Sequence, residues 1–247
     1  MTLQEFFHKY PDIAIAFSGG TDSAYLLYMA KKYAKNTRAF YVSTAFQPDF
    51  EKQDAIRFCK EYDIPLTILE YDILKHPEVV RNPANRCYYC KTALFNQIKK
   101  SAKDAGFSYL ADGTNASDDA DDRPGMKALE ELKVLSPLRL CGITKNELIA
   151  DSNRLGLFTA NKPAYACLAT RIPCETAISK EELALIEHVE SELFTLGFTD
   201  FRARLLPQGV KLQIKEEQLS LFVQKQKEVR NLLTPHFKDI FLDMNFR

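Results

Sequence analysis

A short apolar run that ends at a pair of glycines constrains the fold of this chain more than any other feature. The run, DIAIAF at residues 12–17, is typical of a buried strand. It stops at Ser18, Gly19 and Gly20, after which apolar residues recur at helical spacing over residues 22–35. The local order is therefore strand, glycine turn and helix.

The alternation of strand and helix continues through the first half of the chain. Further strands are predicted at residues 38–44, 66–71 and 108–114, with helices at residues 50–62 and 91–105. Such alternation implies right-handed crossovers and a parallel sheet that is covered by helices on both faces. We predict an α/β fold with a Rossmann-like parallel sheet.

Open parallel sheets bind their ligands beyond the carboxyl ends of the strands. In this chain those ends fall at residues 18–23, 43–46 and 112–115, and each segment carries polar side chains. We therefore expect the three segments to line one site.

The pattern changes after Ser179. A smaller α/β unit is predicted there, from helices at residues 180–196 and 217–233 and strands at residues 202–206, 210–214 and 239–244. The preceding segment, residues 161–178, contains two prolines and has no periodicity, which is typical of a linker or loop. We expect a first domain over residues 1–165 and a smaller second domain over residues 166–247.

The composition of the chain excludes some classes of binding partner. The 247 residues include 33 basic and 33 acidic ones, so the chain lacks the broad positive field that provides most affinity for nucleic acids. Its start has no secretory signal, and no apolar stretch is long enough to span a bilayer. We expect a cytoplasmic protein with neither membrane nor nucleic acid as a partner, whose cysteines serve as thiols or metal ligands.

The glycine turn SGGTDS, residues 18–23, suits an oxyanion. Its backbone amides can point at one spot, and the following helix adds the partial positive charge of its N-terminus. Thr21 and Ser23 offer hydroxyls, and Asp22 can cap the helix or help to hold Mg²⁺. The lysine of a Walker A loop is absent. An ordinary tight turn with a polar helix cap is the alternative for so short a motif.

The complete hexapeptide in this setting resembles that of the PP-loop ATP pyrophosphatases, which cleave ATP between the α and β phosphates and adenylate a substrate oxygen. The strings DGTNASDDADDRPG, LSPL and GITKNEL, at residues 112–125, 135–138 and 142–148, make the chain similar to the LarE group. Within the last string, Thr144 and Glu147 also predict a capping box at a helix start. The resemblance implies a site for ATP and pyrophosphate, with Mg²⁺, at Ser18, Gly19, Gly20, Thr21, Asp22, Ser23, Ser43, Arg86, Gly113 and Thr114.

Two cysteines stand at C-x-x-C spacing, Cys87 and Cys90, in a predicted loop that precedes the helix at residues 91–105. A structural zinc site would need a second close pair, which the chain lacks, and its four histidines are scattered singly. A thioredoxin-like redox site would follow the first strand of its fold. The remaining option is an iron-sulfur cluster shared with a remote third thiolate.

Three other cysteines are weaker candidates for ligands. Cys59 lies in an amphipathic helix and Cys141 precedes a turn glycine, so both are expected to be small buried or half-buried residues. Cys174 follows Cys167 by seven residues in one loop and is a reserve ligand on proximity alone.

The segment KPAYACLATRIP resembles the K-P-A-x-x-C-L-x-x-R-x-P motif of the LarE proteins, ATP-dependent sulfur transferases in the biosynthesis of the nickel-pincer nucleotide cofactor. The resemblance implies that Cys167, Arg171 and Asp22 are catalytic. In one LarE subset the motif cysteine gives up its own sulfur and becomes dehydroalanine. In another, three cysteines hold a [4Fe-4S] cluster, and this chain has that pattern at Cys87, Cys90 and Cys167.

The implied chemistry activates a carboxylate. Because a carboxylate is a poor electrophile, ATP first converts its oxygen into a leaving group, and a sulfur nucleophile then attacks the acyl-adenylate. By the resemblance, the substrate is a pyridinium dicarboxylate mononucleotide whose carboxylates become thiocarboxylates in two rounds. Arg202 and Arg204 are similar to the family's paired arginines, which would bind the phosphate of this nucleotide. Without the resemblance, the spacing of Arg202 and Arg204 would be typical of the solvent face of an edge strand.

Two departures from the family pattern concern the acceptor substrate. Tyr-Gly usually follows the R-x-P of the motif, but Cys174 and Glu175 stand there in this chain. A His-Gly that normally follows the paired arginines is replaced by residues 207–209, Pro-Gln-Gly. Neither change affects the residues implied for ATP.

Other interpretations compete with this one. A PP-loop tRNA thiolase also joins such a loop to a [4Fe-4S] cluster, but the neutral charge argues against it. Sacrificial transfer from Cys167 is the alternative within the LarE group, and an amidating enzyme or a non-catalytic sensor lies outside it. The resemblance further implies a homo-oligomer, with hexamers among the relatives. It makes residues 1–165 the PP-loop domain and residues 166–247 a sulfur-transfer and substrate domain.

Overall fold

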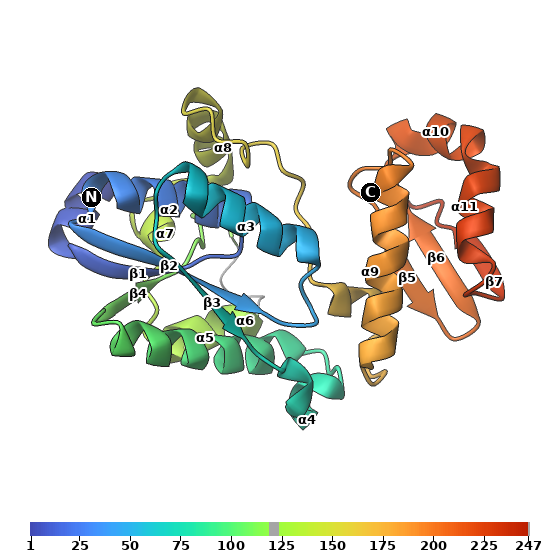
Figure 1. Cartoon of the computed structure of the whole chain (residues 1–247), viewed down its shortest axis with the longest axis horizontal. Coiled ribbons are helices and arrows are strands. Elements are labelled where there is room, and N and C mark those ends of the chain that lie inside the picture. Colours follow the sequence, from blue (N-terminus) through green and yellow to red (C-terminus); the bar gives the residue numbers. More distant parts are fainter. Residues whose placement is uncertain (119–123, 247) are drawn as a thin grey trace. The chain divides into compact units, whose positions relative to one another are not determined.

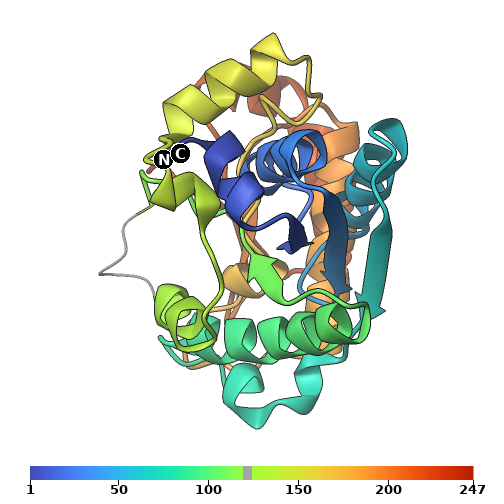
Figure 2. The ribbon, with the colours of Figure 1, turned by 90° about the vertical axis from the view of Figure 1, so that its left-hand side faces the viewer.

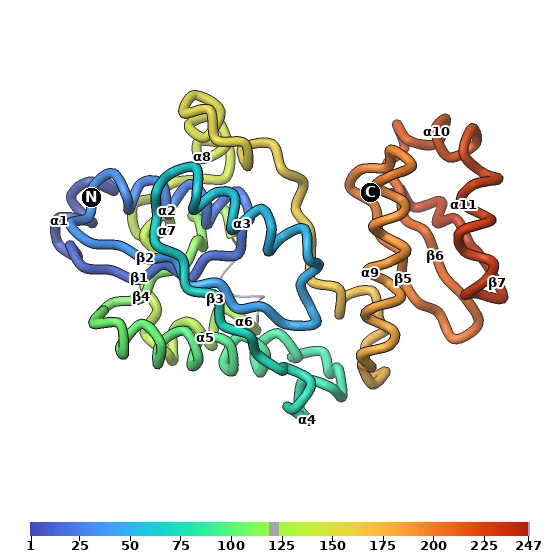
Figure 3. Tube along the Cα trace, viewed as in Figure 1, coloured from blue at the N-terminus to red at the C-terminus, as the bar shows by residue number. Residues whose placement is uncertain are grey.

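The computed structural model describes residues 1–118 and 124–246 of a chain that divides into two compact units (Figure 1). The first unit comprises Met1–Ile73 and Asn85–Lys162, and the second comprises Leu74–Ala84 and Pro163–Arg247. The chain thus passes from one unit to the other three times, as can be traced in Figure 3. The centre of the acidic string DGTNASDDADDRPG, residues 119–123, lies outside the described residues.

A four-stranded parallel sheet with the order β3-β2-β1-β4 forms the first unit. Its strands are β1 (Asp12–Ala16), β2 (Asn36–Ser43), β3 (Leu66–Glu70) and β4 (Tyr109–Ala111). Ile13 pairs with Thr37 of β2 on one side and with Tyr109 of β4 on the other, so β1 is an inner strand. The predicted α/β fold with a Rossmann-like parallel sheet is confirmed.

Helices cover both faces of this sheet. Ile13 and Ile15 pack with helices α1, α2 and α3, whereas Ala14 packs on the opposite side with α5 (Figures 1 and 2). The bounds are α1 (Leu3–Lys9), α2 (Thr21–Tyr33), α3 (Asp49–Glu61), α5 (Arg86–Asp104), α6 (Pro124–Glu131), α7 (Pro137–Leu140) and α8 (Lys145–Arg154). Burial on both faces explains why the first strand is a continuous apolar run and not an alternating one.

The predicted capping box at the start of α8 is confirmed. The hydroxyl oxygen of Thr144 accepts a hydrogen bond from the backbone N–H of Glu147, and the Glu147 carboxylate accepts one from the backbone N–H of Thr144 at 2.9 Å. This reciprocal pair fixes the first turn of α8 and therefore the position of Lys145.

The helix that follows the third strand starts earlier than predicted. We expected it to begin at residue 91, but α5 begins at Arg86, so Cys87 and Cys90 lie in its first two turns. The backbone N–H of Tyr88 already bonds to the carbonyl of Asn85 at 2.9 Å, and no glycine or proline interrupts the helix after that point. Placing the two cysteines in a loop was therefore wrong: they sit three residues apart on one side of a helix.

A three-stranded sheet with the order β5-β6-β7 forms the second unit. Strands β5 (Arg202–Leu206) and β6 (Gly209–Gln213) make an antiparallel hairpin, and β7 (Asp239–Leu242) runs parallel to β6. Helix α9 (Lys180–Thr195) packs Val189 and Leu193 against this sheet. The predicted smaller α/β domain is thus confirmed, and it includes the short 3-10 helices η2 (Leu168–Arg171) and η3 (Glu216–Gln218). A third 3-10 helix, η1 (Ile73–Lys75), spans the first crossing between the units.

The prediction of one helix over residues 217–233 was wrong. The segment forms η3, then α10 (Leu219–Gln224) and α11 (Gln226–Leu233), with a break at Lys225. Val229 and Leu233 of α11 are buried in the core, whereas none of the described residues of α10 is buried. The two short helices therefore do not present one continuous apolar face.

Leu74–Ala84, which we assigned to the first domain, belongs to the second unit. It contains α4 (Pro77–Val80) and is held by the loop that follows η2. The side-chain amide of Asn82 donates to the carbonyl of Pro173 at 2.8 Å, and the backbone N–H of Ile178 donates to the carbonyl of Val80 at 2.8 Å. Because these partners are about 90 residues away, local sequence patterns carry no signal of the contact.

Among the described residues, no helix has both the length and the apolar character needed to cross a membrane.

Replacing Asn82 by aspartate should loosen the attachment of Leu74–Ala84. The substitution keeps the shape and the positive φ of 56° that asparagine tolerates, but turns the donor facing two carbonyls into an acceptor. We expect a loss of about 1–3 kcal/mol locally, seen as hydrogen exchange that is ~10-fold faster or more in this segment. Exposed Asn96 gives the matched control, Asn96→Asp, and equal exchange in the two variants would contradict the assignment.

Candidate active site

The glycine turn forms the connection from β1 to α2. Gly20 is the N-cap residue of α2, and within the described part of the chain no side chain caps that helix end. Gly19 has φ of 75°, and a Cβ atom there would lie 2.9 Å from the Glu51 carbonyl oxygen, so glycine is required on both grounds. The first N–H groups of α2 have no partner within the helix, which makes this end a binding point for an anion.

Hydroxyl groups hold the turn closed. The Oγ atoms of Ser18 and Ser23 lie 3.0 Å apart, and Ser23 donates to the carbonyl of Gly20 at 3.2 Å. The backbone N–H of Ser18 donates to the Oγ of Ser23 at 3.2 Å. These bonds preorganise the loop before any ligand binds.

Thr21 and Lys162 tie the turn to the end of the first unit. The Thr21 hydroxyl donates to the carbonyl of Thr159 at 2.8 Å. The Lys162 ammonium donates to the carbonyl of Gly19 at 3.3 Å and pairs with Asp54 at 2.7 Å, with only 14% of its side chain exposed. A mostly buried cation thus lies directly against the predicted phosphate loop.

Asp22 also has a cationic partner. The Lys145 ammonium, from the first residue of α8, lies 2.5 Å from its Oδ1 atom. Asp22 is about one-third exposed and Lys145 slightly more, so both groups remain accessible to a ligand.

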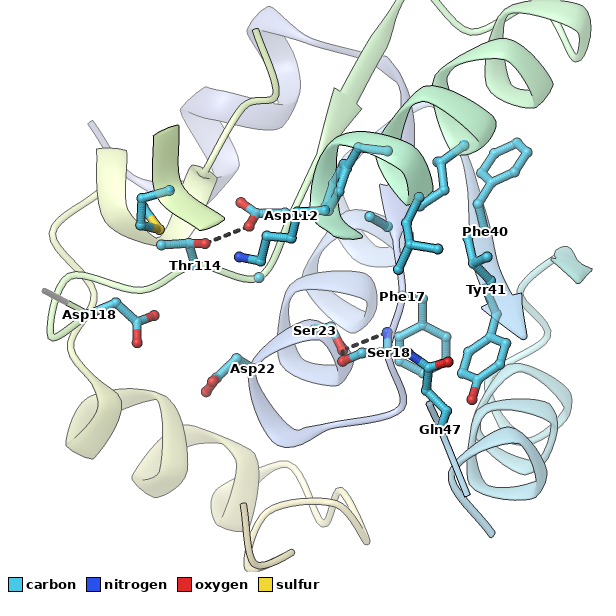
Figure 4. A pocket seen from close by; sticks show the side chains of 18 residues that line it. Phe17, Ser18, Asp22, Ser23, Phe40, Tyr41, Gln47, Asp112, Thr114 and Asp118 are labelled. Atoms are coloured by element: carbon cyan, nitrogen blue, oxygen red, sulfur yellow. Dashed lines mark hydrogen bonds between the residues drawn. The ribbon is translucent and has the colours of Figure 1, made fainter. Parts of the chain in front are cut away.

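A cavity of about 370 Å³ opens beside the turn (Figure 4). One part is polar and is lined by Ser18, Asp22, Ser23, Lys91, Asp112, Gly113, Thr114 and Asp118. The other part is mainly apolar and is lined by Ala16, Phe17, Phe40, Tyr41, Val42, Gln47, Leu94, Phe95 and Ile98, and Met126 completes the lining. A polar end that includes an uncapped helix N-terminus, next to an apolar compartment, suits a nucleotide with its phosphates on the turn.

The end of β4 approaches the turn very closely at Gly113. A Cβ atom on Gly113 would lie 2.8 Å from the backbone nitrogen of Ser23, so only glycine permits this contact. The neighbouring Asp112 carboxylate accepts a hydrogen bond from Thr114 at 2.5 Å (Figure 4). It accepts another from Ser136 at 2.7 Å. The predicted pair Gly113 and Thr114 therefore lies at the cavity, together with Asp112.

Five residues implied for ATP binding are not in the cavity lining: Gly19, Gly20 and Thr21, which belong to the turn itself, and Ser43 and Arg86, which lie elsewhere among the described residues. Ser43 does not line the cavity. Its hydroxyl bonds to the carboxylate of Glu70. Hydrogen bonds from Lys52, the larger cause, and from Ser43 lower the pKa of Glu70 below its usual value. Arg86 is buried at the start of α5 and is likewise outside the lining. Gln47, which we did not predict, lines the cavity in the place expected for the end of β2.

Cys167 lies in the second unit, half-buried at the N-cap of η2, and Arg171 ends that short helix. Arg171 is 1% exposed and binds Glu190 with two hydrogen bonds of 2.9 Å, from Nε and from an Nη atom. Its other Nη atom donates to the carbonyls of Ala166 at 2.8 Å and Cys167 at 3.4 Å. The guanidinium therefore holds the backbone around the cysteine in place.

Glu190 is the centre of this arrangement. Besides the two bonds from Arg171, its carboxylate accepts a bond from the Tyr165 hydroxyl and one from the backbone N–H of Ala203 at 2.7 Å. Burial lowers the pKa of Arg171, but the hydrogen bonds and charge of Glu190 raise it more, so the net shift is upward. The Arg171 guanidinium therefore keeps its positive charge beside Glu190.

Arg202 and Arg204 contact the same segment. Arg202 donates to the carbonyl of Ala164 at 2.6 Å, and Arg204 donates to the carbonyl of Thr170 at 2.6 Å. Arg202 is 4% exposed although β5 is an edge strand, so this is not an ordinary solvent face. The two guanidinium groups meet the loop that carries Cys167 on either side of that residue in the sequence.

None of the six cysteines, all of which the structure describes, forms a disulfide. Cys87 and Cys90 lie together on α5 in the first unit, exposed and half-buried, whereas Cys167 belongs to the second unit. Over the described residues, no three His, Cys, Asp or Glu side chains lie close enough to hold a metal ion. Burial raises the pKa of Cys59 to about 12, which agrees with a filler and not a ligand.

Comparison with known proteins decides the family. No family model matches the chain. Protein slr1717 of Synechocystis sp. is 33% identical over 224 residues, 90% of this chain and 83% of that protein. The pyridinium-3,5-bisthiocarboxylic acid mononucleotide synthase of Lactiplantibacillus plantarum is 27% identical over 235 residues, 94% of this chain and 85% of that enzyme. The tRNA-5-methyluridine(54) 2-sulfurtransferase of Pyrococcus horikoshii is 32% identical over 112 residues, 44% of this chain.

The chain belongs to the LarE family of the PP-loop ATP pyrophosphatases. It is accordingly an enzyme, an ATP-dependent sulfur transferase that uses ATP with Mg²⁺. In this LarE protein the turn at residues 18–23 is the PP-loop, and the cavity beside it is the candidate ATP site.

Sequence reasoning missed the residues whose role is visible only in three dimensions. Lys145 and Lys162 stand within GITKNEL and KPAYACLATRIP, but their contacts with the PP-loop span 123 and 143 residues. Glu190 could have been found, because it lies on the buried stripe of α9 between Ile186 and Leu193, where a carboxylate needs a partner.

Removing one member of the pair formed by Arg171 and Glu190 should be far more damaging than removing both charges. Arg171→Met or Glu190→Gln leaves a buried charge without its partner and is expected to cost about 3–5 kcal/mol in unfolding free energy. The double variant should recover part of this loss in urea titrations. Arg154→Met, from an exposed pair with Asp151, is the control and should lose less than about 1 kcal/mol. If the double variant lost as much unfolding free energy as the two single variants together, the two side chains would not stabilise each other, and the prediction would be contradicted.

Proposed function

We propose that this LarE protein adenylates a carboxylate of a pyridinium-dicarboxylate mononucleotide and replaces its oxygen with sulfur. The product is a thiocarboxylate of the nickel-pincer nucleotide cofactor pathway. The observation that carries the proposal is the cavity that joins the uncapped N-terminus of α2 to an apolar compartment. The L. plantarum relative, whose match covers most of both chains, is named as the synthase of a pyridinium bisthiocarboxylic acid mononucleotide, which supports a product of this kind.

Adenylation would take place at the PP-loop. The first amides of α2 hold the β and γ phosphates while a substrate carboxylate oxygen attacks the α phosphorus. The bond from that phosphorus to the bridging oxygen breaks, and pyrophosphate leaves with the electron pair. A sulfur nucleophile then attacks the acyl carbon, and AMP leaves with the former carboxylate oxygen.

Mg²⁺ fits the site at Asp22. A carboxylate oxygen is the ligand that Mg²⁺ prefers, and the ammonium 2.5 Å away shows that this oxygen attracts a cation. When bound, Mg²⁺ would neutralise charge on the phosphates. Asp22 would hold the ion, and the hydroxyls of Ser18 and Ser23 would keep the loop closed around its ligand.

Arg202 and Arg204 are the proposed phosphate-binding residues for the nucleotide acceptor. Their planar guanidinium groups suit the geometry of a phosphate, and both already contact the segment that contains Cys167. Arg171, buried against Glu190, is proposed to position Cys167 and not to touch the substrate. Residues 166–247 would accordingly serve substrate binding and sulfur transfer.

The three-cysteine [4Fe-4S] cluster is the proposed sulfur carrier, held by Cys87, Cys90 and Cys167. Cys87 and Cys90 are spaced by one helical turn, so both thiolates can bind one cluster. The cluster would supply the sulfur that replaces the carboxylate oxygen.

Helix α5 itself connects the cysteine pair to the ATP site. Lys91 and Leu94, which follow Cys90 on this helix, line the cavity beside the PP-loop. Four residues of helix span only ~6 Å along its axis. A cluster at the start of α5 would therefore lie near the place where the adenylate forms, which an unrelated surface pair of cysteines has no reason to do.

The likeness to the P. horikoshii tRNA sulfurtransferase covers less than half of this chain, so it supports the superfamily and not a tRNA substrate. We also propose the homo-oligomeric assembly implied by the family resemblance, with the hexamer as one form.

Pyrophosphate release tests the adenylation step. We expect the protein with Mg-ATP to release pyrophosphate when the pyridinium dicarboxylate mononucleotide is added, and to release little with the decarboxylated nucleotide, because only a carboxylate oxygen is adenylated. A coupled phosphate assay measures both. Release that is equal with the two nucleotides, or absent with the dicarboxylate, would contradict the proposed substrate.

Iron and acid-labile sulfide content tests the cluster. Anaerobically purified protein should contain about four iron and four sulfide per chain. Cys87→Ala, Cys90→Ala and Cys167→Ala should each lose most of this iron, because each removes a thiolate ligand. Cys174→Ala, which removes a cysteine that is exposed like Cys87, is the matched control and should keep it.

A protein without iron after anaerobic purification would overturn the cluster. So would a single turnover that leaves dehydroalanine at residue 167, which mass spectrometry would detect as the loss of H₂S from that residue. That second outcome would establish sacrificial transfer from Cys167.

A further inference from the structure

Tyr165 stands two residues before Cys167 and contacts two arginines through one aromatic ring. The guanidinium carbon of Arg171 lies over this ring, 4.6 Å from its centre, and that of Arg202 lies 5.3 Å from the same centre. The negative face of an aromatic ring attracts a cation within about 6 Å of the ring centre. One tyrosine therefore binds both guanidinium groups.

The hydroxyl of Tyr165 keeps the ring in place. It donates a hydrogen bond to the carboxylate of Glu190. Burial, and then the negative charge of Glu190, raise the pKa of the Tyr165 hydroxyl above its usual value, so the hydroxyl stays protonated and can donate. The ring is thus held by its hydroxyl end, on the same carboxylate that binds Arg171.

Attachment of the loop backbone does not require an aromatic ring at Tyr165. Arg202 binds the carbonyl of Ala164, on one side of the tyrosine, at 2.6 Å. Arg171 binds the carbonyl of Ala166, on the other side, at 2.8 Å. What the ring adds is a fixed surface on which both guanidinium groups lie.

We propose that Tyr165 is a positioning residue that sets the orientation of Arg202 toward the phosphate of the acceptor nucleotide. It acts through its ring, which also contacts Arg171, the residue that holds the backbone at Cys167. The ring therefore fixes where the acceptor phosphate is held relative to the loop that carries Cys167. A displacement of about 1 Å can slow a reaction by ~100-fold, so this reference position matters for sulfur transfer.

This inference rests on the proposed function and adds to it a residue that determines how tightly the acceptor is bound. Arg202 is the proposed contact with the phosphate, and Tyr165 acts only through that arginine. Loss of the ring should accordingly weaken binding of the acceptor and leave binding of ATP as it is.

The KM for the pyridinium dicarboxylate mononucleotide, measured by pyrophosphate release at saturating Mg-ATP, tests this role. Tyr165→Leu removes the ring and should raise this KM about 10-fold, equivalent to ~1.4 kcal/mol, without changing the KM for ATP. Tyr165→Met also removes the ring but fills more of its volume, and it should give the same rise. Tyr165→Phe keeps the ring and should retain most of the affinity for the acceptor.

Phe158→Leu is the matched control. The Phe158 ring lies 4.1 Å from the guanidinium carbon of Arg57, in the first unit and outside the cavity lining. The control therefore removes a contact of the same kind and should leave the KM for the acceptor unchanged. Thermal unfolding of this variant, of Tyr165→Leu and of Tyr165→Met shows how much stability each loses.

The outcomes separate this inference from the proposed function. If a folded Tyr165→Leu or Tyr165→Met keeps the wild-type KM for the acceptor, the inference is overturned and the proposed function stands. An equal rise in the KM for ATP, or an equal loss in Tyr165→Phe, also overturns it, because the ring would then have no specific effect on Arg202. If the wild type releases no pyrophosphate with the dicarboxylate, the proposed function fails and the inference fails with it.

Discussion

The uncapped N-terminus of α2 is the constraint on which the first unit depends. A helix end with unsatisfied N–H groups is costly to bury unless an anion or a polar group compensates it. The chain surrounds this end with polar groups from distant segments: Ser23 closes the turn, Gly113 brings β4 against it, and Thr21 bonds to the carbonyl of Thr159. Lys145 and Lys162 add positive charge that a phosphate chain can neutralise.

The second unit depends in a similar way on one buried carboxylate. Glu190 has lost its hydration, and four donors replace it: two from Arg171, the Tyr165 hydroxyl and the N–H of Ala203. Such a network is stable only when it is complete, because each missing donor leaves charge buried without compensation. Arg171 of this network also binds the carbonyls of Ala166 and Cys167, so the network fixes the conformation of the loop that carries Cys167.

Local patterns in the sequence predicted most of the fold. The strand, glycine turn and helix at residues 12–35, and the capping box at Thr144, follow from spacing alone, and the observed elements differ from them by a few residues. What the sequence could not show is contact between distant segments. The partners of Asn82 lie about 90 residues away, and those of Lys145 and Lys162 lie farther. Such contacts produce no hydrophobic periodicity from which they could be predicted.

Because α5 begins at Arg86, Cys87 and Cys90 have fixed positions on a helix. In a loop, Cys87 and Cys90 would be two independent thiols whose distance from the ATP site could vary freely. On a helix whose next turns line the cavity, their distance from the adenylate is set by the rise of the helix itself. A sacrificial mechanism would need one cysteine and gives no reason to place two more on a helix that lines the cavity. The proposed cluster, which would be reloaded between turnovers, would use both of them at a fixed distance from the candidate ATP site.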